Sequence, residues 1–172
     1  MNIQQYIAEL DGQTNQIGDL LKGFGPKELT YVPEGKWGIL AILEHILITE
    51  RVVLGLIARP SEELSEYAEL HGTEKMKRLM IDLRQRRVKA PETLAPKGRI
   101  KTCEEFEQEF REYRNTLKED LLTAKIVVDN RIHKHPIIGA MTISDWLSFL
   151  VFHTQRHAEQ IKDLVVQIRS LH

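Results

Sequence analysis

The sequence contains a single cysteine, Cys103, among its 172 residues. One thiol excludes a disulfide framework and a paired-cysteine zinc motif of the CxxC type. The sequence also lacks the basic excess of a nucleic-acid-binding domain, because 24 Lys+Arg residues face 25 Asp+Glu residues. No apolar run reaches the roughly 18 residues that a membrane-spanning helix needs. We therefore expect neither nucleic acid nor a membrane as a partner.

The N-terminus has no basic segment followed by an apolar one, so it does not resemble a secretory signal peptide. Together with the single cysteine, this favours a cytoplasmic protein. Apolar residues make up 42% of the chain, which allows a buried core and argues against intrinsic disorder. The length fits one domain over residues 1–172.

Apolar residues recur every three to four positions in four segments, which is the spacing of an amphipathic helix. The segments run over about residues 2–22, 37–59, 102–124 and 143–170. Thr102 heads a T-x-x-E capping box at the third segment, and a threonine also precedes the fourth. Helices of this number and length predict an all-α four-helix bundle.

The connection over residues 60–101 is long enough to carry the chain back along the bundle. About ten extended residues cover the roughly 34 Å of a 23-residue helix, so the second and third helices can run parallel. Within this connection the pattern predicts an extra short helix over about 73–87 and a turn at 61–70. Strand signals are nearly absent, and residues 125–130 form the only short candidate.

Two histidines, His153 and His157, lie four residues apart on the inward stripe of the fourth helix, so both imidazoles share one face. His45 lies on the inward stripe of the second helix, about 21 Å from its end. The pair lies about 17–23 Å from the start of the fourth helix, so antiparallel helices bring all three to one height. Buried ring nitrogens need partners, and one divalent cation satisfies all three rings.

Three histidines on one cation leave a coordination position open, as in catalytic zinc sites. Nickel, copper and ferrous iron also accept nitrogen ligands. We interpret His45, His153 and His157 as metal ligands, with Zn²⁺ or Ni²⁺ favoured. For each histidine taken alone, a hydrogen-bonded core residue is the alternative.

Two further residues are candidates to support this site. His135 precedes the fourth helix and could reach the mouth of the site, and Gln160 lies three residues after His157 and could orient it. Asp145, near the start of the fourth helix, is expected on its outer side. No residue of the sequence can be assigned as a catalytic acid or base.

Two blocks of the sequence resemble the DinB superfamily, also called the DinB/YfiT-like metal-dependent enzymes. The first is KWGILAILEHILITE at 36–50, where a tryptophan and a small residue precede an aliphatic run that ends in a ligand histidine. The second is HPIIGAMTISDWLSFLVFHTQRHAEQI at 135–161. The matching positions are Trp37, Gly38, His45, His135, Pro136, Gly139, Thr142, His153, His157 and Gln160.

The resemblance implies a bundle of up-down-down-up topology with a three-histidine metal site. Gly38 departs from the pattern, because serine is more usual there. Family members with known activities include transferases and isomerases that use low-molecular-weight thiols, and hydrolases. The resemblance thus implies an enzyme in which one divalent metal activates water or such a thiol against a small-molecule substrate.

Two alternative hypotheses, from other classes of function, stay open. One is a non-catalytic metal-binding or ligand-binding helical module associated with stress, in which His135 closes the site as a fourth ligand. The other is a dimeric helical scaffold without metal, because the second helix is apolar on most sides and could form a homodimer interface.

Overall fold

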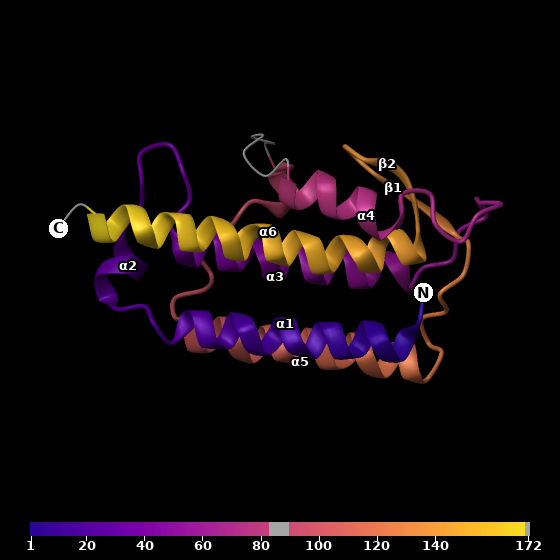
Figure 1. Ribbon diagram of the computed structural model, residues 1–172, viewed down its shortest axis with the longest axis horizontal. Helices are drawn as coiled ribbons and strands as arrows, with labels where there is room; N and C mark the ends of the chain where they lie inside the picture. Colours follow the sequence, from indigo (N-terminus) through magenta and orange to yellow (C-terminus); the bar gives the residue numbers. More distant parts are fainter. Residues whose placement is uncertain (83–89, 171–172) are drawn as a thin grey trace.

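The computed structural model describes residues 1–82 and 90–170, and its four long helices lie side by side in an elongated bundle (Figure 1). These helices are α1 (Ile3–Leu21), α3 (Ile39–Ile57), α5 (Cys103–Leu122) and α6 (Ile143–Ser170). Helices α1 and α6 run in one direction and α3 and α5 in the other, so the order is up-down-down-up (Figure 1). The predicted four-helix bundle is confirmed.

Polar side chains cap the long helices where the sequence predicts them. Thr102 Oγ1 accepts a hydrogen bond from the backbone N–H of Glu105 at 3.1 Å, and the Glu105 carboxylate accepts one from Thr102 N at 3.3 Å. Thr142 and Asp145 form the same reciprocal pair at the start of α6, at 3.3 and 3.1 Å. These bonds satisfy N–H groups that have no partner within the helix.

Asp145 does not lie on the outer side of α6, so that expectation is wrong. It is 1% exposed, and its carboxylate accepts hydrogen bonds from Leu70, His71 and Gly72 backbone N–H groups at 2.9–3.0 Å. Burial alone would raise the pKa of Asp145. The hydrogen bonds from these N–H groups and from Thr142 outweigh that effect together, so the pKa lies below its usual range. This buried carboxylate thus binds the backbone of residues 70–72, between α3 and α5, to the start of α6.

The connection between α3 and α5 contains helix α4 (Gly72–Lys77), a π-helical turn η1 (Arg78–Asp82) and a 3₁₀ turn η2 (Glu92–Leu94). The predicted helix over 73–87 therefore appears as α4 and η1, and its part beyond 82 lies outside the described residues. Residues 61–70 form no helix, so the turn predicted there is an irregular segment. A short helix, α2 (Pro26–Thr30), was not predicted.

A small antiparallel hairpin precedes α6, formed by β1 (Ile132–His135) and β2 (Gly139–Thr142). The candidate strand at 125–130 forms no strand. Gly139 ends the turn at φ +89°, a conformation open to glycine because it has no Cβ. Strands of four residues span only two periods of the alternating side-chain direction, too few to show a period in the sequence.

The core consists of two apolar clusters with a polar layer between them. One cluster gathers around Phe149, Leu117 and Leu10, and the other around Phe106, Phe110 and Ile161. Buried polar residues fill the level between the clusters, and they include Gln13, Thr49, Glu50, Arg114, His153 and Thr154. No helix among residues 1–82 and 90–170 is long and apolar enough to cross a membrane.

Candidate metal centre

The antiparallel neighbours α3 and α6 bring His45, His153 and His157 together in the bundle. The three residues are 4%, 9% and 8% exposed. The Nε2 atom of His153 lies 3.3 Å from Nε2 of His45 and 3.2 Å from Nε2 of His157. One ring nitrogen from each residue lies within 4.8 Å of the other two, as the height argument from the sequence predicts.

Two of these imidazoles are oriented by an oxygen on the far side of the ring. The Nδ1 of His45 donates to the backbone carbonyl of Leu94 at 2.8 Å, because a carbonyl can only accept. The Nδ1 of His157 donates to the side-chain oxygen of Gln160 at 2.9 Å. In a neutral imidazole this leaves Nε2 without a proton, so two lone pairs face His153.

Hydrogen bonds among the three rings cannot satisfy this arrangement. A single proton on Nε2 of His153 can bond to only one of the two bare nitrogens that face it. A divalent cation accepts all three lone pairs. Zinc–nitrogen bonds of 2.0–2.1 Å in a tetrahedral site put the nitrogens roughly 3.3–3.4 Å apart, close to the observed 3.2 and 3.3 Å. The donor set therefore fits one divalent cation.

Burial keeps the three rings neutral. Desolvation lowers the pKa of His45, with the Leu94 hydrogen bond opposing it. Desolvation also lowers the pKa of His157 to about 3, and the neighbouring His45 adds to this effect. The pKa of His153 is held well below its usual range, first by burial and then by the two other histidines. Neutral imidazoles are the form that binds a metal.

Aromatic rings flank the three histidines. The ring of Trp37 lies 5.0 Å from that of His45, and the ring of Phe149 lies 5.1 Å from that of His153. These apolar walls limit solvent around the nitrogens, and this strengthens electrostatic interactions at the site.

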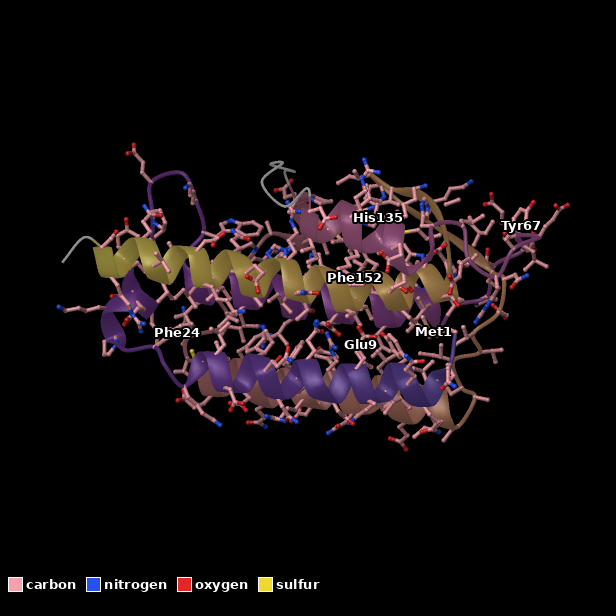
Figure 2. The ribbon with its side chains drawn as sticks, in the orientation of Figure 1. Met1, Glu9, Phe24, Tyr67, His135 and Phe152 are labelled. Carbon is pink, nitrogen blue, oxygen red and sulfur yellow. The ribbon has the colours of Figure 1, made fainter. Side chains whose placement is uncertain are left out.

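His135 lies outside the three-histidine cluster, on the side of α6 that faces away from α1 (Figure 2). Its ring stands 5.1 Å from Phe149 and 5.5 Å from Trp146, and Phe149 in turn stands 5.1 Å from the ring of His153. The Nδ1 of His135 accepts hydrogen bonds from the backbone N–H groups of Ile137 and Ile138, both at 3.1 Å. That nitrogen is thereby occupied within the hairpin.

Two residues that support this site were not predicted from the sequence. Leu94 contributes a backbone carbonyl, which leaves no signal in the residue pattern. Glu44 precedes His45 and is 2% exposed, and its carboxylate binds the segment that contains Leu94. A charged residue within a helix so apolar is the signal that could have found Glu44.

Comparisons with known proteins show matches over most of the chain. The family model described as the DinB superfamily matches residues 9–161, a range that includes all three histidines. The uncharacterized protein YuaE of Bacillus subtilis (strain 168) is 23% identical over 149 residues, covering 86% of this chain and 90% of YuaE. The crystal structure of TT2238, a four-helix bundle protein, has a TM-score of 0.59 at 18% identity and covers 94% of this chain and 99% of its own. The last match shows a shared fold.

Proposed function

This chain belongs to the DinB superfamily, and on that premise we propose that it is a metal-dependent enzyme whose histidines hold one divalent cation, with Zn²⁺ or Ni²⁺ favoured. The observation that carries the proposal is the convergence of the ring nitrogens of His45, His153 and His157 in a buried layer of the bundle. The donor set is nitrogen only, which suits these two ions.

When bound, such a cation acts as a Lewis acid that lowers the pKa of a coordinated water or thiol toward neutrality. The protein's own residues orient the site. The Leu94 carbonyl and the Gln160 side chain fix the rings of His45 and His157, so little reorganisation accompanies binding. The cluster contains no fourth His, Cys, Asp or Glu ligand within residues 1–82 and 90–170, which favours an open position.

The nucleophile of the proposed reaction comes from outside the chain. Cys103 is the only cysteine; it is 8% exposed, and burial raises the pKa of its thiol. A buried thiol of raised pKa is a poor nucleophile. We therefore propose hydrolysis by water, or transfer of a low-molecular-weight thiol, at an electrophilic small molecule. A cytoplasmic location, where such thiols stay reduced, is part of this proposal.

A non-catalytic module with a closed site is the rival function. It requires a fourth protein ligand, and the residue considered for that role, His135, is outside the cluster and has its Nδ1 bound to the hairpin backbone. The geometry therefore favours the enzyme.

The test compares the metal-free protein with protein loaded with Zn²⁺ or Ni²⁺. Each form is assayed for hydrolysis of activated esters and for conjugation of a low-molecular-weight thiol to an electrophilic aromatic halide. We expect turnover in one assay that needs the metal and disappears in His153→Ala. Stoichiometric metal binding without turnover in either assay would favour the non-catalytic module.

A further inference from the structure

A buried carboxylate, next in sequence to a histidine of the candidate metal centre, binds backbone N–H groups of the connection between α3 and α5. Glu44 on α3 is 2% exposed. Its Oε1 accepts a hydrogen bond from Lys97 N at 2.8 Å, and its Oε2 accepts from Arg99 N at 2.8 Å and from Ile100 N at 3.4 Å. Three N–H donors offset the desolvation of one carboxylate, which explains how a charge is tolerated in this apolar helix.

The same segment supplies the acceptor for His45. Leu94, three residues before Lys97, presents its carbonyl to Nδ1 of His45 at 2.8 Å. Adjacent residues of α3, Glu44 and His45, thus hold the two ends of residues 94–100, which we call the strap. Because the strap is only seven residues long, a shift at the Glu44 end moves the Leu94 carbonyl.

A second glutamate contacts only a side chain of the strap. The guanidinium of Arg99 forms two hydrogen bonds to the Glu109 carboxylate on α5, at 2.6 and 2.8 Å. This pair is partly exposed, and it acts on the arginine side chain instead of the strap backbone. Glu109 therefore offers a matched comparison with Glu44. It is also a glutamate bound to the strap, but its bonds go to the Arg99 side chain and not to backbone N–H groups.

We propose that Glu44 is a positioning residue for His45. Its carboxylate sets the place of the strap, the strap places the Leu94 carbonyl on Nδ1, and that bond keeps the proton off Nε2. Without this acceptor the neutral imidazole is free to carry its proton on Nε2, the nitrogen that faces His153. The proposal rests on the proposed function for the metal, whereas the His45 tautomer is a property of the metal-free protein.

The test uses Glu44→Ala and Glu44→Gln, with Glu109→Gln as the matched control. Two readouts are taken: the tautomer of His45 in metal-free protein, by ¹⁵N–¹H correlation NMR, and the Zn²⁺ affinity, by competition with a chromophoric chelator. In Glu44→Ala we expect His45 to lose its Nδ1–H form and the Zn²⁺ dissociation constant to rise by about tenfold or more. Glu44→Gln keeps one acceptor oxygen, so its Zn²⁺ affinity and its fraction of the Nδ1–H tautomer should lie between those of the wild type and Glu44→Ala. Glu109→Gln should match the wild type in both.

A wild-type tautomer and affinity in Glu44→Ala would overturn the proposal. If that variant does not fold, an unchanged His45 tautomer in Glu44→Gln would overturn it instead. Failure of the proposed function is a separate result: a wild-type protein that binds no Zn²⁺ would refute the metal site, while a tautomer shift in the Glu44 variants would still support the positioning role.

Discussion

The side-chain oxygen of Gln160 accepts a hydrogen bond from Nδ1 of His157 at 2.9 Å, one turn further along α6. Gln160 is exposed and His157 is 8% exposed, so the bond links the buried histidine cluster to the surface of the bundle. It does for His157 what the Leu94 carbonyl does for His45. Two of the three rings are therefore oriented by oxygen atoms outside the cluster, which bind the Nδ1 nitrogen that does not face it.

Removing the Gln160 amide should weaken metal binding without removing a ligand. We expect Gln160→Ala to raise the Zn²⁺ dissociation constant by about tenfold, because His157 loses the acceptor that fixes its tautomer. Gln160→Glu should bind at least as tightly as the wild type, since a carboxylate is a stronger acceptor. Chelator competition measures both variants, and Gln167→Ala, an exposed position on the same helix, is the control. Wild-type affinity in Gln160→Ala would contradict this role.

Removing a ring of the cluster should abolish stoichiometric binding. We expect the wild type to hold about one Zn²⁺ or Ni²⁺ per chain and His153→Ala to hold close to none, because its Nε2 lies within 3.3 Å of both partners. Mass-spectrometric metal analysis after dialysis measures the content. His71→Ala is the control, since that ring bonds to the Ala140 carbonyl outside the cluster. Equal metal content in the two variants would rule out the three-histidine site.

The bundle and the meeting of the histidines could be predicted because both depend on long helices. Apolar spacing repeats over five or more turns, and Thr102 and Thr142 mark the starts of α5 and α6 to the residue. Once α3 and α6 run antiparallel, a rise of about 1.5 Å per residue sets the height of His45 against that of His153.

The parts that could not be predicted depend on the backbone. Leu94 acts through its carbonyl, and the partners of Glu44 and Asp145 are N–H groups that every residue except proline carries. No side-chain pattern specifies which N–H groups a buried carboxylate will meet. Asp145 lies off the apolar stripe of the fourth helix, so the residue pattern predicts it on the outer side.

Breaking the buried ion pair between Glu50 and Arg114 on one side only should remove a large share of the stability. Both side chains are nearly fully buried, and Arg114 also donates to Thr154 Oγ1 at 3.0 Å. Arg114→Met leaves the Glu50 charge unpaired in the core, so we expect the free energy of unfolding to fall by about 3–5 kcal/mol. Adding Glu50→Leu should recover most of this loss.

Urea denaturation of both variants measures this effect. Lys22→Met is the control, because it breaks an exposed pair with Asp19 and should leave the midpoint unchanged. An Arg114→Met variant as stable as the wild type would contradict the expected cost of an unpaired Glu50 charge in the core.

His135 should make the metal-free protein less stable in mild acid. Burial lowers the pKa of its imidazole to about 4, against an ordinary value near 6.5, so between these pH values the unfolded chain holds a proton that the folded chain does not. The stabilising effect is complete above about pH 6.5 and decreases as the pH falls toward 4. In His135→Asn the amide oxygen can still accept from Ile137 and Ile138 but does not titrate. Urea unfolding in the presence of a metal chelator at pH 7.5, 6 and 5 should show the wild type losing more stability than this variant, since the three cluster histidines are present in both proteins. Parallel losses would contradict the prediction.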